Sequence, residues 1–395
     1  MPLAEWPETL TFRQLPVGPS RHLVRFLVAN DRTIALKEEP VHVATAEFDV
    51  LRRLEAAGLP AVTAIGLSAW PGRDEAILAT EYLAFSIQYR RLLSRFPLGP
   101  GAYRDRLLDA MASLLVDLHS AGVYWGDCSL ANTLFRRDGD KIQAYLVDAE
   151  TSEIHPSLSD GQRAYDLDIL VENVGFGLAD LGAMQGREDA FEDAVEAAES
   201  VRQSYRALWS ELHDVREMSS GDRQAIRARI RRLNDLGFAV DEISLSPTQS
   251  GDSVALRVAV AGRRFHAREL ARLTGLVALE GQARLLLNDL REYQAWLERE
   301  RGAPLDPSDA ADRWLEEVFE PVVAALRPII GPGRDPIQAY CDVLEEKWLL
   351  SEAEGRDVGL EASLGAYLSL GAPAPEDTVV ALDIDWSGGF DVPSH

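Results

Sequence analysis

The sequence predicts an α+β fold in which a strand-rich lobe and a helical lobe are followed by a mostly α-helical C-terminal domain that contains a β-hairpin. Short segments with alternating apolar residues predict strands within residues 1–83. Segments with apolar residues three to four positions apart predict helices through most of the remaining chain. We therefore expect three units, at residues 1–83, 84–187 and 188–395.

The first unit is expected to contain five strands and one helix. Apolar alternation between turn residues predicts the strands. A helical apolar stripe ends at Gly58, a residue type that readily adopts the left-handed conformation closing a helix. The expected strands are Leu10–Leu15, His22–Ala29, Thr33–Lys37, Val62–Ala69 and Glu75–Glu81, and the expected helix is Val43–Ala57.

The second unit is predicted to place a loop between a helix and a β-hairpin. Arg104–Ser120 carries a helical apolar stripe. Thr133–Phe135 and Ile142–Val147 have the composition of two strands, joined by a turn at Asp138–Gly139. The loop that follows the helix is therefore flanked by regular elements on both sides.

The third unit is expected to be helical apart from one hairpin. Phe191–Leu212 has an apolar stripe, and a second helix is expected to run from a cap at Ser219 or Ser220 to Gly237. The leucine stripe Leu276–Leu297 predicts one long helix with a packing seam, within the domain or between the chains of a homodimer. The remaining expected segments are the hairpin Phe238–Leu245 with Val254–Val260, the helices Ser308–Leu326, Pro336–Leu350 and Leu360–Leu370, and an acidic tail at Asp377–Trp386.

The composition argues against several classes of partner and location. With 64 acidic and 40 basic residues the formal net charge is −24, so the chain is expected to repel nucleic acid and anionic membranes. No apolar run reaches the roughly 18–20 residues of a membrane span. The two cysteines form no disulfide framework, and the N-terminus lacks the pattern of a signal peptide. We therefore expect a cytoplasmic protein.

Two acids and an amide have the spacing that phosphoryl transfer from ATP requires. Asp127 and Asn132 lie five positions apart on one loop, and Asp148 follows the apolar run Ala144–Val147. In such a loop one aspartate accepts the proton of the attacking hydroxyl, while the asparagine and a second aspartate hold Mg²⁺ against the triphosphate. We predict Asp127 as the catalytic base and Asn132 and Asp148 as metal ligands.

Lys37 is the predicted phosphate-binding lysine. It ends the segment Ile34–Lys37, in which a small alanine leaves room for adenine and the lysine reaches the α- and β-phosphates. A lysine whose stem is buried in a strand needs a carboxylate partner, because an unpaired buried charge is costly. Glu47 on the following helix is the predicted partner, and Glu55 is the alternative.

The link between the two lobes is predicted to bind adenine. Glu81 and Leu83 end the fifth expected strand, where the chain passes into the helical lobe. Backbone groups at these residues could hydrogen-bond the base, whatever their side chains are.

Five further polar residues near the loop are interpreted individually. His119 and Cys128 are expected to be packed side chains rather than a base and a nucleophile. Asp166 and Asp168 are expected to hold the backbone of the catalytic loop. Glu150, two residues after Asp148, could approach the metal.

These residues carry a resemblance to a known superfamily. Residues 10–180 resemble the protein-kinase-like fold, and within it the atypical, mostly bacterial branch that includes lipopolysaccharide (Kdo/heptose) kinases and RIO-type kinases. The entire chain also resembles an uncharacterised actinobacterial family in which a lipopolysaccharide-kinase-like N-terminus precedes a domain of unknown function. The resemblance implies a kinase-like N-lobe and C-lobe, ATP and Mg²⁺. The motifs that carry it are Ala35–Lys37, Glu47, Gly126–Asn132 and Val147–Asp148.

The departures from the kinase pattern bear on the acceptor. The glycine-rich loop of the family is reduced to Gly18 between a valine and a proline, which leaves fewer backbone N–H groups for the phosphates. Trp125 stands where the family usually has histidine, and Asp148-Ala-Glu replaces Asp-Phe-Gly. The sequence also lacks an activation segment ending in Ala-Pro-Glu. The last two differences point away from a protein substrate and favour a small-molecule, sugar or lipid-linked hydroxyl, or no acceptor at all.

Three alternatives remain open. A pseudokinase would bind nucleotide at the same site and report its state to a protein partner. A second possibility keeps the site but transfers AMP in place of phosphate. A third is a helical scaffold that binds no nucleotide and uses the Leu276–Leu297 stripe and the arginine-rich segment Arg223–Arg232.

Overall fold

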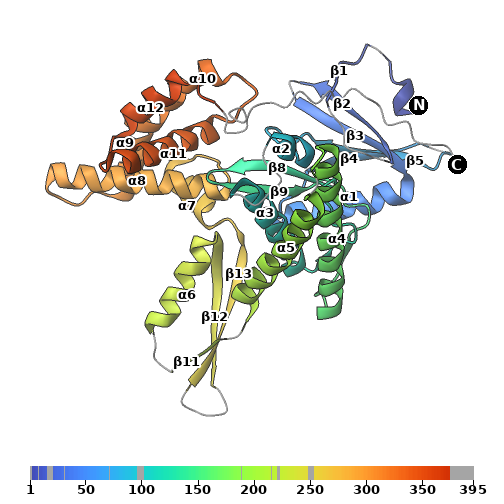
Figure 1. The fold of residues 1–395 in the computed structure, drawn as a ribbon, viewed down its shortest axis with the longest axis horizontal. Helices are drawn as coiled ribbons and strands as arrows, with labels where there is room; N and C mark the ends of the chain where they lie inside the picture. The colour runs from blue at the N-terminus through green and yellow to red at the C-terminus, as the bar shows by residue number, and fades with distance from the viewer. Residues whose placement is uncertain are drawn as a thin grey trace.

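The computed structural model describes residues 2–373, apart from residues 8, 16–20, 31, 71, 96–101, 188, 215, 220–222 and 248–252. Figure 1 shows the strand-rich lobe at the N-terminal end of the chain, helices α3 to α5 in the middle, and a group of helices, α8 to α12, on the side away from that lobe. The predicted α+β fold class is confirmed. Gly18 and the acidic tail Asp377–Trp386 lie outside the described residues.

The N-terminal lobe is a five-stranded antiparallel sheet with one helix packed on it. The strand order is β1-β2-β3-β5-β4, and α1 contacts β4 and β5. The first strand is shorter than expected, whereas β5 has the predicted bounds. Gly58 closes α1 in the left-handed conformation, with φ of 69°. The elements are β1 (Phe12–Arg13), β2 (Leu23–Ala29), β3 (Arg32–Pro40), α1 (Val41–Ala57), β4 (Ala64–Ala69) and β5 (Glu75–Glu81), after a 3-10 turn at Leu3–Glu5.

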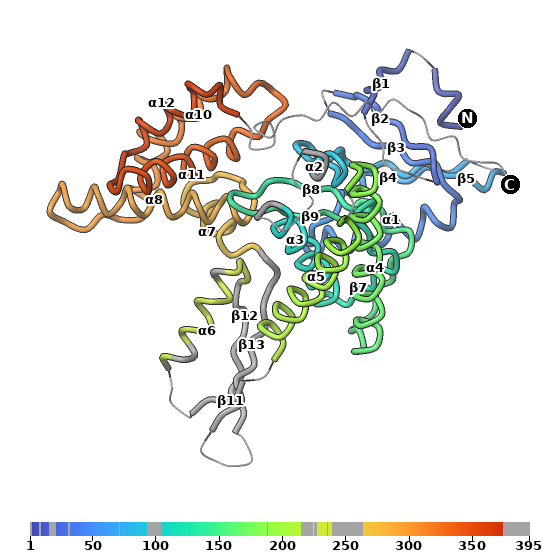
Figure 2. Tube along the Cα trace, viewed as in Figure 1, coloured from blue at the N-terminus to red at the C-terminus, as the bar shows by residue number. Residues whose placement is uncertain are grey.

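The middle region packs three long helices around one apolar core. Helix α5 lies against α3 and α4 (Figure 2), and its residues Ala197, Val201 and Tyr205 belong to the core that also contains the interior of the two lobes. The first helix after residue 188 therefore packs with the lobe that precedes it. The elements are β6 (Ile87–Gln88), α2 (Tyr89–Arg95), α3 (Ala102–Ser120), β7 (Val123–Tyr124), β8 (Thr133–Asp138), β9 (Lys141–Leu146), β10 (Glu153–Ile154), α4 (Asp160–Met184) and α5 (Ala190–His213).

The predicted hairpin of the third unit is present, with one strand more than expected. Strand β11 (Arg216–Ser219) pairs with β13 (Ser253–Arg263), which pairs with β12 (Phe238–Pro247). Helix α6 (Arg223–Asp235) precedes the hairpin. The expectation that Ser219 caps this helix is wrong, because Ser219 pairs with Ser253 in the sheet; Ser220 lies outside the described residues.

The long helix expected across the leucine stripe is present as α8 (Glu280–Arg301), but it begins later than predicted, so Leu276 and Leu279 lie before it. The preceding helix ends at Gly275, whose φ is 74°. Leu286 and Leu290 are buried in a core formed within this region. The elements are α7 (Phe265–Thr274), α8 (Glu280–Arg301), α9 (Pro307–Trp314), a π-helical turn (Leu315–Phe319), α10 (Glu320–Ile330), α11 (Pro336–Glu354) and α12 (Leu360–Ser369). Within the described ranges, no helix is sufficiently long and apolar to cross a membrane.

The tip of the β8–β9 hairpin joins the middle region to the C-terminal helices. Asp138 Oδ1 accepts a hydrogen bond from the backbone N of Gln282 in the first turn of α8, at 2.8 Å. Gly139 exchanges two hydrogen bonds with the Gln338 side chain of α11, at 2.9 and 3.0 Å. A Cβ atom added to Gly281 would lie 2.2 Å from the carbonyl oxygen of Asp138, so this close approach requires glycine.

Candidate active site

Lys37 lies at the centre of a group of carboxylates. Strand β3 pairs it with Val24 of β2 and Leu78 of β5, which places it in the middle of the sheet. Its Nζ donates hydrogen bonds to Glu47 Oε2 at 2.8 Å and to Asp148 Oδ1 at 3.1 Å. It also forms ion pairs with Glu39 and Glu150, at 2.9 and 3.7 Å.

Burial and charge act in opposite directions on the Lys37–Glu47 pair. Burial by itself would lower the pKa of Lys37, but the carboxylates of Glu47, Asp148 and Glu39 outweigh it and raise that pKa. Burial raises the pKa of Glu47 to about 8, and Lys37 opposes this rise. Lys37 therefore stays positively charged, and burial together with the carboxylates of Asp148 and Glu39 favours a proton on Glu47.

Glu47 connects three separate segments. Its Oε2 accepts from Lys37, and its Oε1 accepts from the backbone N of Ala149 at 3.1 Å. Helix α1 thereby links β3 to the segment that carries Asp148. Glu55, the alternative partner of Lys37, instead forms an ion pair with Arg52 at 2.5 Å.

Asp127 and Asn132 contact each other at the two ends of the predicted loop. The Asn132 Nδ2 atom donates to Asp127 Oδ2 at 3.0 Å and to the Asp127 carbonyl oxygen at 3.1 Å. The Asn132 backbone N donates to Ser129 Oγ at 3.2 Å. These bonds orient an exposed aspartate, and they use the nitrogen of the Asn132 amide and not its oxygen.

The buried Asp166 of α4 holds the start of this loop. Its two oxygens accept from the backbone N atoms of Trp125 at 2.7 Å and Gly126 at 2.8 Å, and from Cys128 Sγ at 3.2 Å. The expectation that Asp168 shares this role is wrong, because Asp168 accepts from Arg202 of α5 at 2.5 Å. Asp166 alone of the two therefore supports the loop.

His119 extends this support to helix α5. Its Nε2 lies 3.0 Å from Asp166 Oδ2, and its Nδ1 lies 2.7 Å from the Tyr205 hydroxyl. Burial lowers the pKa of His119, so the ring is neutral. A neutral ring donates from Nε2 to Asp166 and accepts the Tyr205 hydroxyl at Nδ1. His119 is thus packed, as expected, and Tyr205 is a supporting residue that no local sequence signal indicated.

The predicted adenine-binding segment lies between the two lobes. The Glu81 backbone N donates to the Thr63 carbonyl at 2.8 Å, which keeps this residue in the sheet. The Leu83 carbonyl accepts from Ser86 Oγ at 2.7 Å. The Glu81 carbonyl oxygen and the Leu83 N–H group are not used in these two hydrogen bonds. Adenine binding by this segment remains a prediction.

The oxygen atoms of Asp148 and Asn132 suit Mg²⁺. This ion prefers hard oxygen ligands and is usually held by one or two carboxylates together with substrate phosphates. Asp148 supplies a half-buried carboxylate and Asn132 an amide oxygen. The donor set therefore fits the metal that the sequence predicts.

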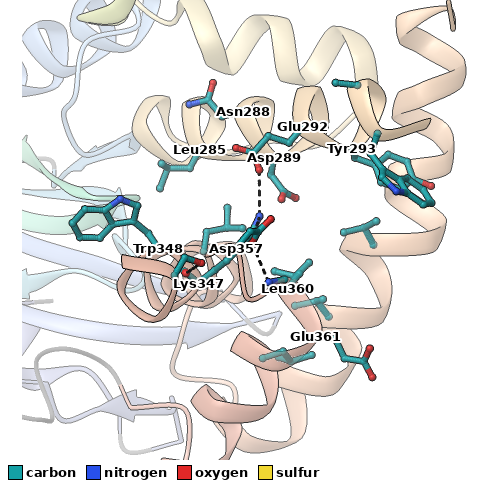
Figure 3. Close-up of a pocket in the computed structure, with 18 of the residues that line it drawn as sticks. Leu285, Asn288, Asp289, Glu292, Tyr293, Lys347, Trp348, Asp357, Leu360 and Glu361 are labelled. Atoms are coloured by element: carbon teal, nitrogen blue, oxygen red, sulfur yellow. Dashed lines mark hydrogen bonds and ion pairs between the residues drawn. The ribbon is translucent and has the colours of Figure 1, made fainter. Parts of the chain in front are cut away.

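A separate cavity of about 2000 Å³ lies among the C-terminal helices. Figure 3 shows Trp348 and Tyr293 toward opposite ends of it, with Asp289, Glu292 and Lys347 between them. Its walls come from α8, α11, α12 and the π-helical turn, with a few residues of the middle region. Its described lining residues do not include Lys37 or the predicted loop of Asp127 and Asn132.

Two family models match different parts of the chain. Residues 32–184, which contain Lys37, Glu47, Asp127, Asn132 and Asp148, match the lipopolysaccharide kinase (Kdo/WaaP) family. Residues 207–370 match a domain of unknown function, DUF4032. The predicted resemblance of the N-terminal part to lipopolysaccharide kinases, followed by a domain of unknown function, is confirmed.

Individual known proteins are also similar to this chain. The lipopolysaccharide core heptose(I) kinase WaaP of Pseudomonas aeruginosa is 28% identical over 157 residues, which are 36% of this chain and 55% of that kinase. The chain thus spans about half the length of this relative. A solved structure of WaaP in complex with acyl carrier protein has 19% identity and a TM-score of 0.34, over 58% of this chain and 90% of the WaaP chain.

Proposed function

We propose that this protein is an ATP- and Mg²⁺-dependent phosphotransferase that acts on a hydroxyl of a small-molecule, sugar or lipid-linked acceptor. The observation that carries the proposal is the contact of Lys37 with both Glu47 and Asp148, which lie 10 and 111 positions away in the sequence. The match to a family of lipopolysaccharide kinases favours a sugar or lipid-linked acceptor.

In this proposal each side chain has a defined task. Lys37 orients the α- and β-phosphates of ATP, and Glu47 holds the ammonium group in position. Asp127 accepts the proton of the acceptor hydroxyl while that oxygen bonds to the γ-phosphorus and ADP leaves. Asp148 and Asn132 would hold Mg²⁺, which neutralises charge on the phosphates.

The rate enhancement would come mainly from positioning. Asn132 orients the Asp127 carboxylate through the 3.0 Å hydrogen bond. Asp166 fixes the backbone of the loop on which that carboxylate stands. Such preorganisation can supply a large part of the barrier reduction in a reaction that needs little covalent chemistry from the protein.

One observation favours a second candidate, a nucleotide-sensing pseudokinase. Glu39 and Glu150 add two carboxylates beside Lys37, and their charge opposes a triphosphate. A site of this kind could bind nucleotide weakly and report its state to a protein partner without transferring phosphate.

The first experiment is calorimetric titration of the full chain with a nonhydrolysable ATP analogue, with and without Mg²⁺. We expect Mg²⁺-dependent binding that Asp148→Asn removes and that Asp312→Asn, a change of an exposed aspartate on α9, leaves intact. Absence of binding by folded wild type would contradict both candidates.

Turnover separates the candidates. With ATP and a panel of sugar and lipid-linked acceptors, wild type should form a product heavier by one phosphate, and Asp127→Asn should bind ATP but lose transfer. Nucleotide binding without any product would favour the pseudokinase. A product heavier by AMP would replace phosphate transfer with adenylate transfer.

A further inference from the structure

A second set of metal-ligand side chains lies beside Lys37. His22 directly precedes β2, Glu39 is on β3, and Glu150 follows the segment of Asp148. One ligand atom from each of the three lies within 4.8 Å of the other two. His22 Nε2 and Glu150 Oε2 are already 3.1 Å apart.

Glu39 is the member of this set that its protein surroundings satisfy least. Its residue exposure is 2%, and Oε2 lies 2.9 Å from Lys37 Nζ. Nevertheless, neither carboxylate oxygen forms a hydrogen bond of acceptable geometry with any described group. A buried carboxylate without hydrogen bonds is costly, and a bound ion is one recognised reason for such a group to persist.

The charge around Lys37 also requires compensation. With a proton on Glu47, Lys37 contributes one positive charge and Glu39, Asp148 and Glu150 contribute three negative charges, a formal balance of −2. One lysine therefore cannot neutralise the group. A divalent cation would bring the balance to zero.

We propose that His22, Glu39 and Glu150 bind a divalent transition-metal ion, such as Mn²⁺, Co²⁺ or Zn²⁺. The imidazole ligand favours these ions over Mg²⁺, which selects oxygen ligands. Three protein ligands leave further coordination positions open to water or to a ligand. The site is separate from the pair Asp148 and Asn132, and it does not depend on phosphotransfer.

The consequence for the fold is a link between distant segments. His22 and Glu39 belong to the N-terminal sheet, whereas Glu150 belongs to the segment after β9. An ion bound by all three would fix the position of that segment against the sheet. It would also remove part of the negative charge that opposes a phosphate group beside Lys37.

The test is a titration of the metal-free full chain with Co²⁺ alone, followed by its visible absorption. We expect one equivalent to bind with the bands of a nitrogen-containing site, and His22→Ala and Glu150→Gln each to weaken binding by at least about 10-fold. The matched control is His155→Ala. His155 forms a similar 3.1 Å contact with Glu153 near the surface, and its removal should leave Co²⁺ binding unchanged.

Far-UV circular dichroism shows whether each variant is folded, and Glu39→Gln replaces His22→Ala if the latter is not. Absence of Co²⁺ binding by folded wild type would overturn the proposal. Binding unaffected in folded His22→Ala but lost in Asn132→Ala would also overturn it, since the ion would then occupy the predicted Mg²⁺ site. The titration contains no nucleotide, so Co²⁺ binding that depends on His22 supports this metal site whether or not the protein transfers phosphate. A lack of phosphotransferase activity would count only against the proposed reaction.

Discussion

Residues 32–184 and residues 207–370 differ in what surrounds their acidic side chains. In the first region Lys37 lies among four carboxylates from several segments, although a single carboxylate would be enough to form an ion pair with it. In the second region the half-buried Asp289 accepts from Trp314 Nε1 at 2.8 Å and from the Tyr340 hydroxyl at 2.6 Å, and both of these partners belong to an apolar core. An excess of carboxylates around one lysine is typical of a functional site, whereas a carboxylate hydrogen-bonded by its packing neighbours indicates a structural role.

The cavity and the charged cluster lie in different regions. The cavity of about 2000 Å³ is in the C-terminal region, while the charged cluster is in the N-terminal region. The cavity therefore does not coincide with the predicted site. The predictions below test whether the two regions are separable in stability and in function.

Trp314→Ala should give the largest effect. The side chain is fully buried in the C-terminal core, so its removal should lower the free energy of unfolding by about 3–5 kcal/mol, measured by denaturant titration. Trp296→Ala, at a position that is 47% exposed, is the control and should cost much less. If the regions are separable, ATP-analogue binding by folded Trp314→Ala should equal that of wild type; its loss would show that the core is shared.

Asp166→Ala tests the N-terminal region, residues 32–184. It leaves the backbone N–H groups of Trp125 and Gly126 and the ring of His119 without their acceptor, which should cost about 3 kcal/mol. Phosphotransfer should be lost with it, because the loop carrying Asp127 is no longer held. Asp180→Ala, at an exposed position of the same helix, should change neither property. Full activity in folded Asp166→Ala would contradict the positioning role.

Gly281→Ala tests the contact between the regions. The new methyl group would meet the carbonyl oxygen of Asp138, and the displacement should cost about 1–3 kcal/mol. Differential scanning calorimetry should then resolve two transitions where wild type shows a more cooperative one. Gly365→Ala, where a Cβ atom has open space, is the control. An unchanged thermogram for Gly281→Ala would mean that the hairpin tip does not couple the regions.

The smallest expected effect is a pH dependence that comes from His119. Burial lowers its pKa below the ordinary value of 6.5, so the unfolded chain binds more protons here than the native state does. The contribution of His119 to stability is therefore complete above about pH 6.5 and declines as the pH falls through that value. The stability difference between wild type and His119→Asn should shrink from pH 7.5 to 5. Tyr205→Phe retains the His119 imidazole, so its stability should change with pH as that of wild type does. A stability difference between wild type and His119→Asn that stays constant from pH 7.5 to 5 would contradict the prediction.

Local patterns predicted the strand-rich lobe well and the start of the leucine-stripe helix less well. The fifth strand, Glu75–Glu81, has the predicted bounds because its apolar alternation and flanking turn residues act locally. The stripe helix begins at Glu280 and not at Leu276, because leucine spacing does not mark where a helix starts and Leu276 directly follows Gly275, which ends the preceding helix. The three-unit division and the roles of the site residues remain predictions.

By itself, the sequence determined most of the longer strands and helices and placed Asp127, Asn132, Asp148 and Lys37 at spacings that predict phosphoryl transfer. Only the tertiary structure decided which carboxylates surround Lys37, and that Tyr205 and His119 support the loop through Asp166. Spacing along the chain encodes contacts made within a helix, a hairpin or a loop. Contacts between residues far apart in the sequence depend on how the elements pack, and one chain without that packing does not specify them.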